Sequence, residues 1–443
     1  MIDYIYVKKI FGEFDYKISL ENQIKLIIGP NGCGKTTFFK IIHSLISQRH
    51  AGLYDLEFES IEVGRGNDIL KLIKKMYSHP NMEDEEFSGE EMKEDIEYYL
   101  NGEFIGVLKE QKSVGLSYFV NNVPNLFRYG AGYIIDRETN QIYDKNSIYD
   151  LIKKYHNILP NDFSTLPKEA TKFLAEEKID FISTERLLHE PIDIDPYERN
   201  PQPTKTINVY SKKIKDLISN NTSIYAKISQ NIDQVFPKKI VDILNAGSVS
   251  IDKAQIQEQV EKIQNLRNKL INTSVIEPNN QVEQLLIEDF KDMDGTTLLV
   301  LQEYYKSTLE KLESLEPFAN QIELFLEKYN KKLNTSGKKI NIDHYNGFYI
   351  TNRNEEIIDI SKLSSGEQHE FIQLYSLIFN TKEDQLILID EPEISLQVSW
   401  QREYVEDLES IIKHKNLRVI IATHSVQIVN NNWDKVLNMG EVE

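Results

Sequence analysis

The clearest candidate for chemistry is the loop GPNGCGKTT, which runs from Gly29 to Thr37. It fits the pattern G-x-x-x-x-G-K-[ST] through Gly29, Gly34, Lys35 and Thr36. In such a loop, backbone N–H groups surround phosphate oxygens, the lysine reaches the β- and γ-phosphates, and the threonine hydroxyl is a ligand of Mg²⁺. An apolar strand precedes the loop and an apolar-periodic helix follows it, as a phosphate loop requires. The candidate nucleotide contacts in this loop are Gly29, Pro30, Asn31, Gly32, Cys33, Gly34, Lys35, Thr36 and Thr37.

Three further side chains follow buried strands near the other end of the chain. Asp390 and Glu391 end the apolar run LILIDE, and His424 follows the apolar run RVIIA. The carboxyl ends of parallel strands meet at one edge of a sheet, so these side chains are expected beside the phosphate loop. There Asp390 is a candidate Mg²⁺ ligand together with Thr36. Lys35, Glu391 and His424 are the candidate catalytic residues, because Glu391 is placed to activate water and His424 to sense the γ-phosphate.

A second phosphate-binding pattern lies far from the first. In LSSGEQHEF, from Leu363 to Phe371, a Ser-Ser-Gly-Glu turn opens an apolar helix. A serine hydroxyl and free helix N-terminal amides suit a phosphate. The same pattern also describes a serine that caps an ordinary core helix. The candidate contacts here are Ser364, Ser365, Gly366 and Glu367.

The elements that must position these residues fall into three stretches of the chain. Continuous apolar runs near both ends, such as IKLII and QLILID, predict a parallel sheet covered on both faces. Apolar positions at three- and four-residue spacing predict helices between these ends. Two interpretations stand for the helices: a subdomain that packs on itself, or a short antiparallel coiled-coil arm. The predicted domains are an N-terminal lobe at 1–205, a helical insertion at 206–335 and a C-terminal lobe at 336–443.

Composition limits the class of protein. The chain has 443 residues, 40% apolar and 27% charged, with a formal net charge of −19. No apolar run is long enough to cross a membrane and no signal peptide is recognisable, so a cytoplasmic protein is expected. The single cysteine, Cys33, fits a reducing compartment, and its alkylation is predicted to block nucleotide binding.

Part of the negative charge is local. Residues Met82 to Glu97 include nine acids and one lysine. Two interpretations stand for this stretch: a solvated acidic loop, or a docking site for a basic partner. The remaining negative charge argues against a broad DNA-wrapping face.

Taken together and in this order, the phosphate loop, LSSGEQ, LILIDEPEISLQ and ATHS resemble the motifs of the ATP-binding-cassette (ABC) ATPases. They look most like the branch that includes SMC-like repair ATPases, OLD-type proteins and the solitary ATPases of anti-phage defence systems. The resemblance implies an α/β fold: an ABC-ATPase head with a mixed, largely parallel sheet flanked by helices, plus the inserted helices. It also implies hydrolysis of ATP with Mg²⁺. In that family LSSGE is the signature, Ser395-Leu396-Gln397 lies at the D-loop, and His424 matches the switch histidine.

The same resemblance carries an expectation about assembly. In this family two heads face each other head-to-tail, and each signature closes over the ATP that the other head holds. One phosphate loop and one signature per chain then imply a homodimer with two ATPs at an isologous interface. In that dimer the Ser365 hydroxyl completes a cage around the γ-phosphate. Higher oligomers are left open.

The chain departs from the family pattern in three places. Gly366 stands 331 residues after Lys35, which is farther than in transporter cassettes, so a transporter subunit is not expected. Glu185, within FISTERL, stands where the glutamine-loop residue is expected and is a candidate metal contact. Glu393 stands where the family often has threonine, and the sequence assigns no role to this third acid.

The predicted role is a sensor or regulatory scaffold in anti-phage defence, similar to the ATPase partners in Septu-, PARIS- or retron-type systems. Only 19 residues follow His424, which leaves no room for the Toprim nuclease domain of OLD-type relatives. A separate effector, a nuclease or toxin, and a phage-derived trigger are therefore expected. The alternative is a DNA-repair or recombination ATPase of the RecF or SMC-like kind, which predicts salt-sensitive DNA binding. A third class is a regulatory or assembly ATPase with no link to nucleic acid, and direct DNA binding is left open.

Overall fold

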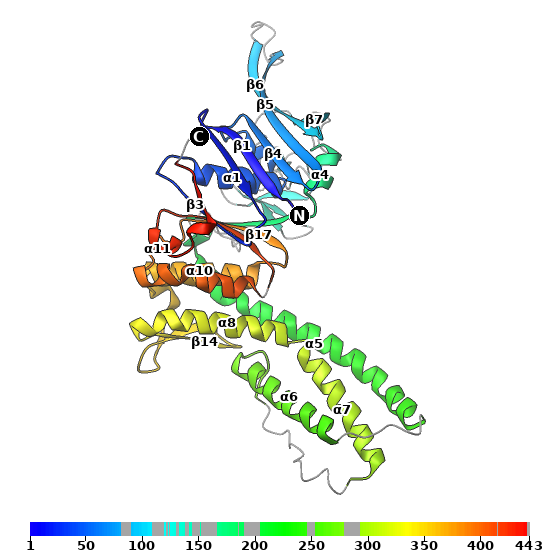
Figure 1. The fold of residues 1–443 in the computed structure, drawn as a ribbon. Helices are drawn as coiled ribbons and strands as arrows, with labels where there is room; N and C mark the ends of the chain where they lie inside the picture. The colour runs from blue at the N-terminus through cyan, green and yellow to red at the C-terminus, as the bar shows by residue number, and fades with distance from the viewer. Residues whose placement is uncertain are drawn as a thin grey trace. The chain divides into compact units, whose positions relative to one another are not determined.

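The fold is described in two compact units, from a computed structural model of the chain (Figure 1). The first unit comprises Met1–Thr204 with Asn380–Glu443, and the second comprises Lys205–Phe379. The second unit thus includes 336–379, which the sequence analysis assigns to the C-terminal lobe; the domain boundaries stay predictions. The residues that the structure describes are 1–80, 90–108, 119–120, 123, 125–129, 133–137, 141–143, 151, 166–184, 186–189, 204–245, 253–278, 293–413 and 415–440.

A parallel sheet of five strands forms one layer of the first unit, in the order β11-β17-β18-β3-β19. Every residue of β17 and β18 is buried, which explains their continuous apolar sequences. Because all five strands run in one direction, the residues that follow them meet at one edge of the sheet. The strands are β3 (Ile24–Ile28), β11 (Lys178–Ile182), β17 (Gln385–Asp390), β18 (Arg418–Ala422) and β19 (Val436–Asn438).

An antiparallel sheet of six strands forms the other layer of this unit, in the order β2-β1-β4-β5-β6-β7. In β5 and β6 the ladder is long, running from Leu70↔Leu100 to Pro80↔Glu90. The strands are β1 (Tyr4–Ile10), β2 (Phe14–Ser19), β4 (Ser60–Arg65), β5 (Asp68–Pro80), β6 (Glu90–Leu100) and β7 (Glu103–Leu108).

One hydrophobic core joins the two sheets of the first unit. Phe38 and Ile42 of helix α1 (Lys35–Ile46) belong to the same cluster as Ile5 of the antiparallel sheet and Leu388 of the parallel sheet. The predicted α/β class, with a largely parallel sheet flanked by helices, is confirmed. The remaining elements of this unit are β8 (Leu126–Tyr129), β9 (Tyr133–Asp136), β10 (Gln141–Tyr143), α4 (Lys168–Leu174), β12 (Leu188–His189), α10 (Val398–Ile412) and α11 (Val426–Val429), and β13 (Thr204–Lys205) lies at the boundary.

The second unit contains the long helices that the periodicity predicts. Helix α7 packs against both α5 and α6. Ion pairs Lys311–Asp233 and Lys239–Glu303 show that α5 and α7 are antiparallel, since the numbers on one helix rise as those on the other fall. Both interpretations of these helices, a subdomain that packs on itself and a short antiparallel coiled-coil arm, stay predictions. The helices are α5 (Thr206–Asn245), α6 (Lys253–Asn272), α7 (Gly295–Glu313) and α8 (Glu316–Leu333).

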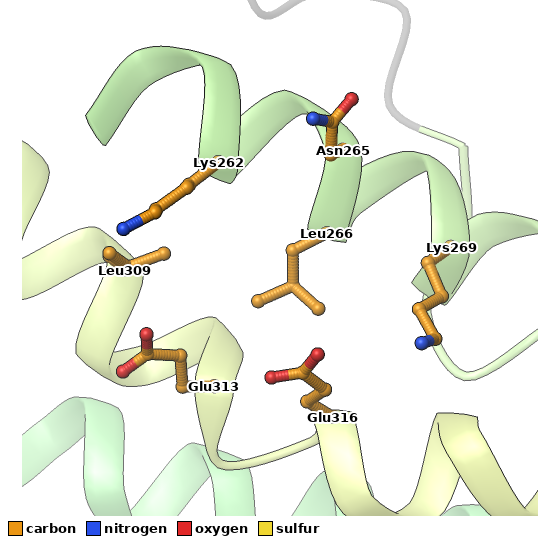
Figure 2. A pocket seen from close by; sticks show the side chains of 7 residues that line it. All are labelled: Lys262, Asn265, Leu266, Lys269, Leu309, Glu313 and Glu316. Carbon is orange, nitrogen blue, oxygen red and sulfur yellow. The ribbon is translucent and has the colours of Figure 1, made fainter. Parts of the chain in front are cut away.

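Between α6, α7 and α8 the second unit has a hollow of about 410 Å³ (Figure 2). Leu266 and Leu309 line it together with lysines from α6 and glutamates from α7 and α8. Those lysines pair with other acids of the same unit: Lys262 with Glu258, and Lys269 with Glu323. The hollow is therefore a feature of helix packing with locally balanced charges.

The rest of the second unit is a three-stranded antiparallel sheet and helix α9 (Ser365–Tyr375). Stacked and edge-on rings of Phe325 from α8, Phe348 from β15 and Phe371 from α9 hold these elements together. The strands are β14 (Lys339–Asp343), β15 (Gly347–Thr351) and β16 (Ile357–Ile358). Within the ranges that the structure describes, no helix has the length and hydropathy needed to span a membrane.

Candidate nucleotide site

The phosphate-loop sequence forms a tight backbone turn between β3 and α1. Gly32 and Gly34 have φ angles of 84° and 88°, in the left-handed region that favours glycine. A Cβ on Gly29 would lie 2.8 Å from the Cys33 sulfur, so the loop closes on itself there. Helix α1 has no side-chain cap and no acid in its first turn. Its N-terminal amides and positive dipole end are therefore available to an anion.

Lys35 lies inside this loop. Its Nζ donates to the carbonyl oxygens of Gly29 and Pro30, both at 3.0 Å, and the residue is 6% exposed. The loop is braced from outside by Tyr16 of β2, whose hydroxyl lies 2.8 Å from the Cys33 carbonyl oxygen and 2.9 Å from that of Met439. The positive charge of Lys35 is thus held by two carbonyl oxygens of the loop itself.

Thr36 and Asp390 meet although 354 positions separate them in sequence. The Thr36 hydroxyl donates to Asp390 Oδ2 at 2.8 Å, and the Thr184 hydroxyl lies 3.3 Å from the same oxygen. Asp390 is 1% exposed, and its other oxygen, Oδ1, has no hydrogen-bond partner among the described residues. A buried carboxylate oxygen without a partner is costly. A hydroxyl beside such a carboxylate is an oxygen donor set that fits Mg²⁺.

Glu391 and His424 face each other at the ends of neighbouring strands. Glu391 Oε1 lies 3.8 Å from His424 Nε2, and both side chains are about one-third exposed. Glu391 has a φ of 45°, an unusual value for a side chain that carries a Cβ. Its N–H donates to the carbonyl of Ala422 at 2.9 Å, which ties this turn to β18. The pair can therefore contact water and a ligand from one rigid edge.

Two groups that the sequence analysis did not select contact this turn. Arg186 is buried, and its guanidinium nitrogens lie 3.5 Å from the carbonyl oxygen of Asp390 and 3.4 Å from that of Glu391. Thr184 contacts the Asp390 carboxylate, as described above. Thr184 was detectable in principle, since it follows the parallel strand β11. Arg186 was not, because contacts to backbone carbonyls leave no pattern in a sequence.

Glu393, the acid without an assigned role, contacts the loop of the switch histidine. One oxygen accepts from the Thr423 hydroxyl at 2.8 Å and the other from the His424 backbone N–H at 2.6 Å. Next to it, Ser395 of the D-loop segment has a φ of 63°. Glu185 and residues 82–89 of the acidic stretch lie outside the described residues, whereas residues 90–97 of that stretch belong to strand β6 and not to a loop.

The signature stretch lies in the second unit and starts α9 with a capping box. The Ser364 hydroxyl accepts from the Glu367 N–H, and the Glu367 carboxylate accepts from the Ser364 N–H at 2.8 Å. Ser364 and Ser365 are exposed, whereas Gly366 and Glu367 are buried. The side chains that a ligand can reach at this helix start are therefore the two serines.

The Glu367 carboxylate is fully engaged within its own unit. It accepts from Lys338 Nζ at 2.8 and 2.9 Å and from the Ser336 hydroxyl at 2.9 Å. Burial opposes its ionisation, but the hydrogen bonds from Lys338, Ser364 and Ser336 outweigh it and hold the pKa of this carboxyl below its ordinary value. The structure thus shows Glu367 as a residue that holds the helix start in place.

The chain is similar to known ATP-binding proteins. A family model described as "AAA ATPase domain" matches residues 1–429. The spermidine/putrescine import ATP-binding protein PotA of Mycoplasma genitalium is 22% identical over 442 residues, covering 94% of this chain and 69% of that protein. The zinc import ATP-binding protein ZnuC of Rickettsia prowazekii is 35% identical over 79 residues, covering 18% of this chain and 33% of that protein.

Solved structures of Smc heads also align with the chain. The Smc head domain of Pyrococcus furiosus, with an extended coiled coil and bound to the C-terminal domain of ScpA, gives a TM-score of 0.37 at 12% identity. That alignment covers 99% of this chain and 92% of the other. The family match spans most of the residues, and the motifs occur in the order of the ABC ATPases. The chain belongs to the AAA ATPase domain family.

Proposed function

We propose that this protein binds ATP with Mg²⁺ at the loop of Gly29 to Thr37 and hydrolyses it there. The observation that carries the proposal is the Thr36–Asp390 pair, with one buried Asp390 oxygen that has no hydrogen-bond partner in the described part of the chain. In this proposal Thr36 and Asp390 hold Mg²⁺, which when bound neutralises phosphate charge. Lys35 and the α1 amides hold the phosphates. The binding role of Glu185 stays a prediction.

The chain's own groups supply the remaining chemistry. Glu391 is the general base: its partly exposed carboxylate accepts a proton from the attacking water. His424 lies 3.8 Å from that carboxylate and presents an imidazole to the γ-phosphate side of the site. Glu391, with its strained backbone, directly follows β17, at the sheet edge where the phosphate loop begins after β3.

The exposed serines of α9 support a proposal about assembly. We propose that two copies close head-to-tail, so that Ser365 and the α9 N-terminus of one copy contact the ATP of the other. The exposure of Ser365 beside buried, rigidly held neighbours supports this. ATP then favours the closed dimer because it binds that state better than the open one.

The test is the variant Glu391→Gln, with Glu406→Gln on the exposed side of α10 as the matched control. Turnover should fall by about 10³-fold when the base is lost, while ATP binding persists. Light scattering should then show a long-lived dimer with ATP and monomer without it. A variant that turns over ATP normally contradicts the base assignment, and a monomer at saturating ATP contradicts the dimer.

We further propose that the closed dimer regulates a separate effector, a nuclease or toxin, in anti-phage defence. The motif resemblance supports this role. Co-expression with the product of the neighbouring gene, followed by co-purification with and without ATP, tests it directly. DNA binding that weakens steeply with salt would instead favour the repair-type role.

A further inference from the structure

We propose that Glu393 is a positioning residue: its carboxylate holds the loop of His424 against the turn of Glu391. This inference rests on the proposed function, because it assigns a task to a third acid at the same edge. The sequence motifs assign no role to Glu393. Because it follows Asp390 and Glu391 closely in the chain, the alternative is that it acts as another metal ligand or general base.

The hydrogen bonds of Glu393 fit a residue that holds the adjacent loop in place. Oε2 accepts from the Thr423 hydroxyl and Oε1 from the His424 N–H, at 2.8 and 2.6 Å. Thr423 is fully buried, and its hydroxyl also accepts from the Ser425 N–H at 3.0 Å. Both carboxylate oxygens therefore face protein donors in the adjacent loop.

The two Glu393 hydrogen bonds lie just beyond the point where pairing between β17 and β18 stops. The ladder between β17 and β18 ends at Asp390↔Ala422. Beyond it, the bond from the Glu391 N–H to Ala422 and the two Glu393 bonds join the turn to the loop. Without the side chain of Glu393, the loop that carries His424 keeps one fewer anchor on this turn.

The turn itself needs such support. Glu391 and Ser395 both have positive φ angles, 45° and 63°, a conformation that costs energy for residues with a Cβ. Arg186 contacts the carbonyls of Asp390 and Glu391 from the β11 end. Glu393 contacts the β18 side, so the turn is held from two directions.

The relative activities of three variants, with glutamine, aspartate or alanine at position 393, distinguish a positioning role from a chemical one. Glutamine has the same length and can accept the His424 N–H while donating to the Thr423 hydroxyl, which accepts as readily as it donates. Aspartate keeps the charge but is one methylene too short. Alanine removes both contacts. A positioning role predicts that glutamine preserves function and aspartate does not; a metal ligand or base predicts the reverse.

The expected kinetic result is a split between kcat and KM. Glu393→Ala and Glu393→Asp should lower kcat by about 10²-fold through misplacement of His424, with KM for ATP little changed. Glu393→Gln should stay within about fivefold of the wild type. Thr423→Val, which removes one of the two contacts, should fall between glutamine and alanine.

A second readout needs no nucleotide. Amide hydrogen exchange at the His424 N–H should be protected in the wild type and in Glu393→Gln, and unprotected in Glu393→Ala. If Glu393→Ala does not fold, the glutamine–aspartate comparison decides alone. Equal His424 protection in folded Glu393→Ala, or aspartate outperforming glutamine, overturns the proposal. If the wild type hydrolyses no ATP, the proposed function is wrong, and the exchange measurement still tests whether Glu393 holds the loop of His424.

Discussion

Two buried acids, one in each unit, show how different the two motif regions are. Asp390 uses one oxygen for Thr36 and Thr184 and leaves the other without a partner in the described structure. Glu367 uses both oxygens, which accept from Lys338, Ser336 and Ser364. The first carboxylate has one oxygen without a partner among the described residues, whereas the second is satisfied by its own unit.

The difference between Asp390 and Glu367 shows that acids in two sequence motifs of one chain can have different roles. An unpaired buried carboxylate oxygen costs stability, and in the function proposed above that oxygen of Asp390 is kept for Mg²⁺. A carboxylate enclosed by donors contributes to folding. Variants at the two positions should therefore separate function from stability.

The largest effect is expected from Asp390→Asn. The neutral amide oxygen is a weaker Mg²⁺ ligand than a carboxylate, so turnover should fall by on the order of 10³-fold. The nucleotide-free protein should melt no lower than the wild type, because the change removes a buried charge. ATP turnover across a Mg²⁺ titration and thermal melting without nucleotide check the two halves.

The control for this experiment is Glu406→Gln, an exposed acid of α10. It should leave both turnover and melting unchanged. Normal turnover in Asp390→Asn would show that the unpaired oxygen is not a metal ligand, and a large loss of melting temperature would show that the carboxylate is structural after all.

The neighbouring serines of the signature should give the next largest effect and behave oppositely. Ser365→Arg places a bulky side chain at the exposed start of α9, so hydrolysis should fall by about 10²-fold or more while ATP binding is spared. Ser364→Ala removes the cap and should lower the free energy of unfolding by about 1 kcal/mol. Turnover, binding of a fluorescent ATP analogue and urea unfolding distinguish the two. Unimpaired turnover in Ser365→Arg contradicts the dimer-completed site.

Much of this arrangement follows from sequence, for a physical reason. Continuous apolar strands predict a parallel sheet, and a parallel sheet brings the residues after its strands to one edge; this placed Asp390, Glu391 and His424 beside the phosphate loop. Contacts between side chains and backbone carbonyls, such as those of Arg186, have no periodicity and were missed. The engagement of Glu367 was missed as well, because Lys338 and Ser336 lie about 30 positions away in an unrelated hairpin region.

Lys338→Met should produce a smaller effect that is confined to stability. It leaves Glu367 buried without its cation, which should lower the free energy of unfolding by about 1–3 kcal/mol. The double variant Lys338→Met with Glu367→Gln should recover part of the loss, because no unpaired charge remains. Urea unfolding of the four proteins in this cycle measures the coupling. Zero coupling would show that the ion pair contributes nothing beyond its separate groups.

The smallest effect concerns pH and follows from the sign of the Glu367 pKa shift. The pKa of this carboxyl is lowered from its ordinary 4.5, so the ionised form is the one that the fold favours. Its contribution to stability is therefore complete above about pH 4.5 and is lost as the pH falls through the lower value of the folded state. The difference in the free energy of unfolding between the wild type and Glu367→Gln should be constant from pH 7 to 5 and shrink below 4.5. Glu406→Gln, at an exposed site, is the control variant for the same pH series. If the difference in the free energy of unfolding between the wild type and Glu367→Gln grew on acidification, the fold would favour the protonated carboxyl of Glu367. Glu367 and Asp390 would then differ only in their hydrogen bonds.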